Sequence, residues 1–385
     1  MDVWLQQYPW LDDLFIGFVA LTWKHAVMWA VGMLLIWLAV KRDVEPMLLL
    51  PIGFGAILAN IPYSSAVSQV PGEEGFLWVL YQMGIANELF PILVFVAVGA
   101  MCDFTPLIRR PLVMLFAAAS QFGIFATAVV AVLVGFSFEH AAAIGIIGAA
   151  DGPTTIFVAS RYARGLLGPL AVAAYSYMAL VPIIQPPIIR ALTTADERRI
   201  KMEYPDEKAV SRNAKIAFPL LVVLLAGIVA PMSVALIGSL MFGNLLKEAG
   251  CVERLAGAAE NELANLVTLL LGITIGGTME AERFLTADVA LIMCLGAVAF
   301  VFDTAAGVLF ARAVNVFSKK KINPMIGACG ISAFPMSGRV VAKMALAEDP
   351  SNYLIQHAVG VNVAGQVASV IAGGLVLALI PVLMK

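Results

Sequence analysis

Long apolar stretches recur along the whole chain. A helix that spans a membrane needs about 20 mostly apolar residues, and windows of this kind are found, for example, at 112–136, 170–189, 218–246 and 289–311. They lack the apolar-polar alternation of a membrane barrel strand. Because lipid leaves only helical bundles and closed barrels as solutions, the pattern predicts an all-α polytopic membrane protein. We expect roughly ten helical segments, whole or broken.

The composition strengthens this prediction and excludes one class of partner. Hydrophobic residues make up 61% and charged residues 13% of the 385 positions, and the mean hydropathy is +0.92. These values lie outside the range of soluble globular chains. The net charge of −2 leaves no basic face to follow phosphates, so we expect no nucleic-acid partner.

Loop charges predict the topology, because Lys and Arg collect in cytoplasmic loops. The basic groups that this rule places inside are Lys41 with Arg42, Arg109 with Arg110, the loop 198–215, and Arg312 with Lys319, Lys320 and Lys321. Acidic residues suited to the outside are Glu73, Glu74, Glu280 and Glu282.

Counting crossings between these loops leaves two stretches that should not cross the membrane fully. The first, 141–160, is interrupted by Gly152-Pro153, and the second, 323–335, is also short and rich in helix breakers. Irregular backbone at membrane depth must line protein or water. We therefore expect two broken or re-entrant hairpins, the first entering from outside and the second from inside.

The two hairpins fit a faint internal duplication. Four landmarks, among them Arg161 with Arg339 and Phe104 with Phe284, recur at offsets between 177 and 180. The loops after the paired segments differ in charge, which favours inverted repeats, and such repeats place substrates near the midplane. Coincidence among Gly-rich apolar segments is the alternative. The predicted division is 1–75 for N-terminal membrane segments, 76–215 for the first repeat and 216–385 for the second.

Asp151 is the sharpest chemical signal in the chain. A charge at the centre of a membrane helix costs on the order of 3 kcal/mol, so this carboxylate should face an interior partner or water. The Gly-Pro break frees backbone carbonyls beside it, and Thr154 and Thr155 add hydroxyls. An all-oxygen set of this kind suits a hard cation. The alternative is a carboxylate that only caps the helix after the break.

The second hairpin supplies groups that complement this carboxylate. Asn323 lies at its start, Gly327 lets backbones approach closely, and Ser332 and Arg339 follow. Singly, Asn and Ser are more often caps or interhelical hydrogen bonds than ligands. Arg339 either anchors the membrane surface or holds an anionic substrate.

Three further polar residues lie within apolar runs. Asn362 needs a polar partner, which is either a ligand site or a helix-packing hydrogen bond. Tyr177 is either an interfacial residue or a buried proton donor, and Asp303 is equally ambiguous. No Ser-His-Asp set, P-loop or dinucleotide fingerprint accompanies them. The chain therefore shows no means of activating a substrate alone.

Four motifs, at 146–157, 242–248, 322–336 and 357–365, resemble the beta subunits of the sodium-pumping, biotin-dependent decarboxylases that act on oxaloacetate, methylmalonyl-CoA and glutaconyl-CoA. The likeness runs from about Glu45 to the C-terminus. It implies that carboxybiotin on a soluble partner is decarboxylated at this subunit, that a proton is consumed, and that sodium is driven outwards. Val361, Gln366 and Ala368 depart from the family pattern, which leaves the acyl substrate open.

The resemblance also implies roles for individual residues. Its sodium-site aspartate matches Asp151, and the other functional positions match Tyr177, Asn323, Gly327, Ser332, Arg339 and Asn362. From this match we expect Asp151, Tyr177 and Arg339 to be catalytic, with Arg339 also facing the biotin. The expected sodium ligands are Asp151, Asn323, Gly327, Ser332 and Asn362.

The implied setting is a complex in the cell inner (cytoplasmic) membrane. Its expected partners are a carboxyltransferase alpha subunit, a biotin carrier protein and a small gamma or delta membrane anchor subunit, with further copies of this chain in a homo-oligomer. Sodium ion and partner-bound biotin are the expected cofactors. The main alternative is a sodium-coupled carboxylate symporter that works alone. A purely structural subunit would not explain Asp151.

Overall fold

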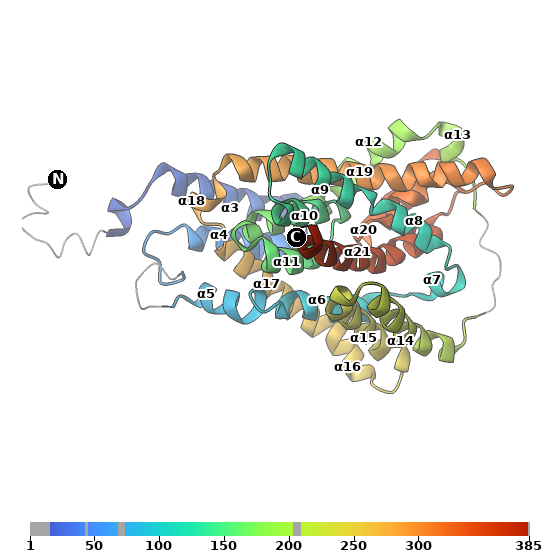
Figure 1. Ribbon diagram of the computed structural model, residues 1–385, viewed down its shortest axis with the longest axis horizontal. Coiled ribbons are helices and arrows are strands. Elements are labelled where there is room, and N and C mark those ends of the chain that lie inside the picture. Colours follow the sequence, from blue (N-terminus) through green and yellow to red (C-terminus); the bar gives the residue numbers. More distant parts are fainter. Residues whose placement is uncertain (1–15, 43–44, 68–73, 203–208, 384–385) are drawn as a thin grey trace, which may run out of the picture.

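The protein is helical throughout the part of the chain that the structure describes. This structure is a computed structural model, and it describes residues 16–42, 45–67, 74–202 and 209–383. In these residues seven helical stretches are long and apolar enough to cross a membrane, or eight if the bent pair Phe76–Ile85 and Leu89–Met101 forms one span. The predicted all-α polytopic fold is confirmed (Figure 1).

The first half of the chain contains most of the short and interrupted helices. Its elements are α3 (Trp23–Arg42), α4 (Pro46–Ala59), α5 (Phe76–Leu80), the π-helical turn η1 (Tyr81–Ile85), α6 (Leu89–Met101), α7 (Thr105–Arg109), α8 (Val113–Ser120), α9 (Phe122–Val134), α10 (Phe138–Ile146), the 3₁₀ turn η2 (Ile147–Ala149), α11 (Gly152–Tyr162), η3 (Arg164–Leu166), α12 (Leu167–Leu192) and α13 (Ala195–Arg198).

The second half is built around two long helices. Its elements are α14 (Arg212–Val229), η4 (Pro231–Ser233), α15 (Val234–Ala249), α16 (Glu253–Ala258), the π-helical turn η5 (Ala259–Leu263), α17 (Ala264–Gly277), α18 (Ala281–Phe284), α19 (Ala287–Phe317), the 3₁₀ segment η6 (Pro324–Gly330), α20 (Met336–Glu348) and α21 (Ile355–Leu383).

One apolar window divides differently from the prediction. The stretch 218–246 is not one helix, because α14 ends at Val229 and α15 folds back along it after a 3₁₀ turn at Pro231. Proline disfavours helix in the residue before it, and Ala230 leaves the helical region accordingly. Hydropathy alone does not register such a break.

Ion pairs mark one end of the helical bundle. Lys24 at the start of α3 pairs with Glu282 of α18 at 2.5 Å, and Arg161 at the end of α11 pairs with Glu88 before α6 at 2.6 Å. The span formed by α8 and α9 begins beyond Arg110, which contacts His357 at the start of α21 at the other end of the bundle. This span therefore ends on the side of the two ion pairs, and α10 starts there. The broken segment α10–η2–α11 therefore enters and leaves at the same end.

The second broken segment enters from the opposite end. Asn323, just before η6, donates to the carbonyl of Arg198 at 2.7 Å, and Glu348 at the end of α20 pairs with Arg198 at 2.6 Å. The two segments meet inside the bundle, where the Ser332 amide donates to the Ala149 carbonyl at 2.8 Å. The two predicted hairpins thus enter from opposite ends.

Other expectations stay predictions. The internal duplication, the three domain boundaries and the side of the membrane on which each end lies are not tested by these contacts. Residues 1–15 of the first predicted domain, Glu73 and part of the basic loop, 203–208, lie outside the described residues.

Candidate functional site: a carboxylate between two broken segments

Local sequence explains the break in the first segment. Ala150 adopts a left-handed conformation with φ of 50°, which ends η2. Asp151 then caps α11 by accepting from the Thr154 amide at 3.0 Å through Oδ1. Pro153 lies in the first turn, where its missing N–H costs nothing. The capping role weighed for Asp151 is therefore confirmed, but it occupies only one carboxylate oxygen.

The second oxygen of Asp151 faces the other broken segment. Oδ2 accepts from Ser332 Oγ at 3.1 Å and from Ser369 Oγ at 2.6 Å, and the two hydroxyls lie 3.1 Å apart. Asp151 is 4% exposed, and no Lys, Arg or His of the described residues forms an ion pair with it. A buried carboxylate in this state needs a cation or a proton.

A pocket of about 170 Å³ opens beside this carboxylate. Its polar lining comes mainly from Asp151, Ser332 and Gln366, and most of the opposite side is hydrocarbon from α4, α6 and α17, such as Phe95 and Leu271. A small ion reaching Asp151 therefore meets protein oxygens mainly on one side, since α17 contributes only the hydroxyl of Thr268.

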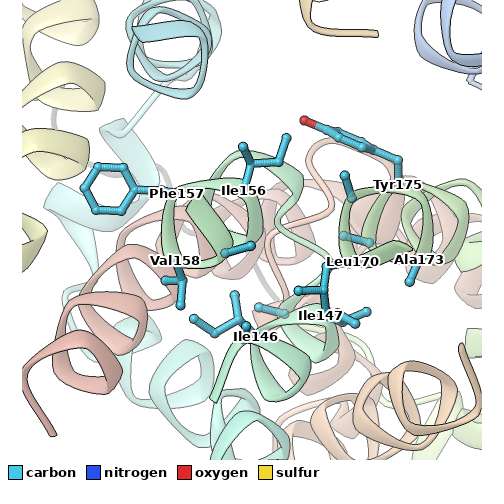
Figure 2. Close-up of a cluster of buried hydrophobic side chains, with 14 of the residues drawn as sticks. Ile146, Ile147, Ile156, Phe157, Val158, Leu170, Ala173 and Tyr175 are labelled. Carbon is cyan, nitrogen blue, oxygen red and sulfur yellow. The ribbon is translucent and has the colours of Figure 1, made fainter. Parts of the chain in front are cut away.

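Aliphatic side chains fix the backbone under the site. Figure 2 shows Ile146 and Ile147 at the break, with Ile156 of α11 and Leu170 of α12 in the same cluster. Tyr175 lies at the edge of the cluster (Figure 2), and the residue also lines the pocket. Close packing of this kind holds the carboxylate at a fixed position.

The second broken segment consists of the 3₁₀ helix η6 and the non-helical residues after it, and side chains of neighbouring helices donate to its carbonyls. From α8 and the residue after it, Ser120 Oγ donates to the Gly327 carbonyl at 3.1 Å and Gln121 Nε2 to that of Gly330 at 3.0 Å. These amide and hydroxyl groups replace helical hydrogen bonds, which buried backbone requires.

Two further helices complete this set. Gln185 of α12 donates to the Ala328 carbonyl at 2.8 Å, and Asn362 of α21 donates to those of Ile331 at 2.8 Å and Cys329 at 3.2 Å. The second segment is thus held by α8, α12 and α21 together.

A polar stripe on α21 connects this scaffold to the carboxylate. Asn362 and Ser369 make the contacts above, and Gln366 between them donates to the Ser332 carbonyl. Their spacing of four and three residues places all three on one helix face. Asn362 Oδ1 has no hydrogen-bond partner among the described residues.

The structure brings only some of the predicted site residues together. Asp151, Ser332 and Asn362 lie around the meeting point of the two segments. Gly327 packs against Gly307 of α19, so closely that a Cβ atom on Gly327 would lie 2.0 Å from the Gly307 carbonyl oxygen.

The remaining three lie away from Asp151. Asn323 binds the carbonyls of Arg198 and Ile200 at the end of the bundle. The Tyr177 hydroxyl donates to the carbonyl of Met293 on α19. Arg339, in the first turn of α20, is exposed, and its side chain has no hydrogen bond or ion pair within the described residues.

Sequence reasoning missed five residues of this site, one of which is Ser120, the donor to the Gly327 carbonyl. Ser369 was not singled out, Gln366 was noted only as a departure from a family pattern, and Gln121 and Gln185 were overlooked. The signal was present for Ser369 and Gln366, because Asn362, Gln366 and Ser369 share a helical spacing inside an apolar run.

The fold and the site together place this chain in the class of ion-coupled membrane proteins. It is a multi-pass membrane protein whose discontinuous helices meet at a buried carboxylate that forms no ion pair within the described residues. The comparison with known families makes this specific. Residues 24–380 match the family described as the Na⁺-transporting oxaloacetate decarboxylase beta subunit, and the chain belongs to this family.

Curated relatives agree with the family match. The chain is 47% identical over 364 residues to the glutaconyl-CoA decarboxylase subunit beta of Acidaminococcus fermentans, covering 94% of this chain and 95% of that one. It is 46% identical to the methylmalonyl-CoA decarboxylase subunit beta of Veillonella parvula, with the same coverage. It is 42% identical to the oxaloacetate decarboxylase beta chain of Klebsiella pneumoniae, covering 94% and 96%. The resemblance inferred from the motifs is confirmed.

Proposed function

We propose that this chain is the membrane subunit of a sodium-translocating decarboxylase. It couples decarboxylation of carboxybiotin on a partner carrier to sodium export, with uptake of one proton for each carboxyl group released. Membership of the decarboxylase beta family supports the activity. The observation that carries the mechanism is the buried Asp151 carboxylate, which meets two hydroxyls where the two broken segments touch and pairs with no cationic side chain among the residues described.

The hydroxyls of Ser332 and Ser369 suit a site that fills and empties. A hydroxyl has one donor hydrogen and two acceptor lone pairs. Without a cation both hydroxyls donate to Asp151, as the distances of 3.1 and 2.6 Å describe. With sodium bound, each turns its hydrogen away and offers a lone pair instead, so no backbone movement is needed to supply hard oxygen ligands.

Asp151 also provides the coupling, because the same carboxylate binds either sodium or a proton. Of the predicted ligands other than Asp151 and Ser332, Asn362 is linked most directly to this carboxylate, because it donates a hydrogen bond to the carbonyl of Ile331, the residue before Ser332. Asn323 and Gly327 act by holding the second segment in place. In this role they affect sodium binding without contacting the ion.

The predicted catalytic roles of Arg339 and Tyr177 rest on their chemistry. Arg339 is an exposed guanidinium that forms no ion pair or hydrogen bond with the described part of the chain, which suits the carboxylate of an incoming carboxybiotin. Tyr177 can deliver a proton only after its hydroxyl leaves the Met293 carbonyl.

The proposed setting is a complex in the cell inner membrane. The partners are a carboxyltransferase alpha subunit, a biotin carrier protein and a gamma or delta membrane anchor subunit, with this chain as a homo-oligomer. The family and its curated relatives, which are named as subunits, support assembly with other chains.

Asp151→Asn tests the mechanism, because the amide keeps the shape but cannot hold a cation by charge. In proteoliposomes of the reconstituted complex, we expect sodium transport and decarboxylation to fall together by at least about 100-fold. Asp288→Asn, an exposed position in the first turn of α19, is the matched control. Sodium-dependent turnover that survives in Asp151→Asn would refute the role of Asp151.

The symporter alternative makes a different prediction. A symporter would take up an external carboxylic acid with sodium when the chain is reconstituted alone. The proposed pump would show no such uptake, and would decarboxylate carboxybiotin only with sodium present. Uptake without the partners would favour the symporter.

A further inference from the structure

A second buried carboxylate lies in the bundle outside the site described above. Asp303, in the middle of α19, is 0% exposed. The backbone amides of Gly123 and Ile124 face it, but neither of its oxygens completes a hydrogen bond within the described residues. A polar group in this state costs about 1–3 kcal/mol or more, which calls for an explanation.

Two glycines pack against this carboxyl group, one at each oxygen. A Cβ atom on Gly123 would lie 2.4 Å from Asp303 Oδ1, and one on Gly148 would lie 2.5 Å from Oδ2. Gly123 is at the start of α9, and Gly148 belongs to η2, the turn that leads to Asp151. The carboxyl of Asp303 therefore forms part of the support of the first broken segment.

The elements packed against α19 bring no counter-charge to this position. Of these, α8, α9, η2 and η6 contain no Lys, Arg or His. The titratable or charged residues of the packed elements are Cys329 on η6, Tyr175, Tyr177 and Arg190 on α12, and Glu139 with His140 in the first turn of α10. No ion pair with Asp303 occurs among the described residues.

A proton fits this position better than a metal ion. A hard cation needs several oxygen ligands around it, whereas two sides of this carboxyl are occupied by glycine Cα atoms. A proton neutralises the group without any ligand. It removes the cost of a bare charge amid hydrocarbon.

We propose that Asp303 is an exchangeable proton-binding site, separate from Asp151, whose proton keeps η2 packed against α19. This inference deepens the proposed function, in which turnover takes up a proton. When the proton leaves, a bare carboxylate remains against Gly148, and the close packing becomes unfavourable. The turn before Asp151 then moves, so proton occupancy at Asp303 and cation binding at Asp151 are linked.

Infrared spectroscopy of the purified protein in saturating sodium tests the site directly, because a protonated carboxyl absorbs apart from a carboxylate. We expect a buried carboxylic-acid band that shifts in heavy water. It should be absent in Asp303→Asn and retained in Asp151→Asn and in the exposed control Asp288→Asn. Absence of such a band from the wild type, or a band that never shifts in heavy water, would overturn the proposal.

Measuring the number of bound sodium ions distinguishes a failure of this proposal from a failure of the proposed function, on which it rests. Asp303→Asn should bind as many sodium ions per chain as the wild type, whereas loss of one ion would make Asp303 a metal site and refute a proton site. A failure of the proposed function would give a different result. If the acid band measured in saturating sodium disappears in Asp151→Asn, then Asp151 carries a proton under these conditions and does not bind sodium.

A second variant covers the case in which Asp303→Asn does not fold. Gly148→Ala places a methyl group against Oδ2, so the acid band should change frequency. Gly238→Ala is the matched control, since a Cβ atom there meets nothing within 4 Å. An unchanged band in Gly148→Ala would contradict the contact on which the proposal rests.

Discussion

The two broken segments solve the same problem in opposite ways. In the first, the break carries a charge: Asp151 caps α11 and turns its other oxygen toward a pocket. In the second, the break carries no charge, and three donors, from the end of α8 and from α12, bind its carbonyls at Gly327, Ala328 and Gly330. A break with spare acceptors can exchange a ligand, whereas a saturated one is a rigid support.

Among the variants that test this comparison, Arg339→Ala should have the largest effect on activity. Arg339 is a cation next to the second broken segment, and it is unpaired within the described residues. We expect decarboxylation in the complex to fall by at least about 100-fold, because a charged hydrogen bond to the substrate carboxylate is lost, while sodium binding is retained. Lys343→Ala, an exposed residue on the same helix, is the control. Unchanged turnover would remove Arg339 from the mechanism.

Ser369→Ala sharpens the distinction at the exchanging segment. Removal of one hydroxyl beside Asp151 should weaken sodium binding by about tenfold, or about 1.4 kcal/mol. Titration calorimetry with sodium measures the change. Ser160→Ala is the control, because Ser160 is equally buried but binds only the Phe157 carbonyl. Equal affinities in the two variants would show that Ser369 is not a ligand.

Gln121→Leu tests the rigid segment. The Gly330 carbonyl loses its donor, and an unsatisfied buried carbonyl costs about 1–3 kcal/mol of stability. A lower midpoint of thermal unfolding in detergent should accompany an unchanged sodium affinity. The exposed Gln356 provides the control Gln356→Leu, which should have no effect on the midpoint. A large loss of sodium affinity in Gln121→Leu would mean that both segments bind the ion.

The smallest effect is expected where the rigid segment is anchored. Glu197 of α13 pairs with Arg312 at 2.9 Å; partial burial raises the pKa of this carboxyl, but hydrogen bonds from Thr194 and Arg312 outweigh it and leave the pKa below its usual value. A carboxyl group whose pKa is lower in the folded than in the unfolded state stabilises the fold at pH values above its unfolded-state pKa. This stabilisation is lost as the pH falls through the folded-state pKa.

Glu197→Gln should therefore reduce stability by no more than about 1 kcal/mol at neutral pH. The difference from the wild type should vanish in acid, as unfolding midpoints measured across pH would show. A difference that persists at low pH would indicate that packing, not charge, accounts for the effect.

The sequence was sufficient for the helical fold, apart from the division of 218–246 into two helices, and for the charged break. Asp151-Gly152-Pro153 combines a cap, a breaker and a charge in an apolar run, and each of these acts locally. The meeting of Asp151 with Ser332 was also foreseeable from the two interrupted stretches, because broken helices in such proteins meet at the midplane.

The carbonyl donors could not be predicted in the same way. Gln121 and Gln185 lie 209 and 143 residues from the carbonyls they bind, and nothing local to either residue indicates the unwound backbone. Their partners depend on how α8 and α12 pack around η6. The same applies to Asp303, whose surroundings are created by glycines on two other elements.

The one-sided lining of the pocket has a consequence for loading. Leu48, Phe95 and Leu271 offer no oxygen to an ion at Asp151, and α17 adds only the hydroxyl of Thr268 to the lining. If Asp151 binds sodium as proposed, we expect the ion to arrive still carrying water on that side. Under the proposed function, closing the site around the ion is therefore also a dehydration step, because apolar side chains would have to replace that water. We then expect the packing of this hydrocarbon lining, as well as the carboxylate, to set how much of its hydration shell the ion loses.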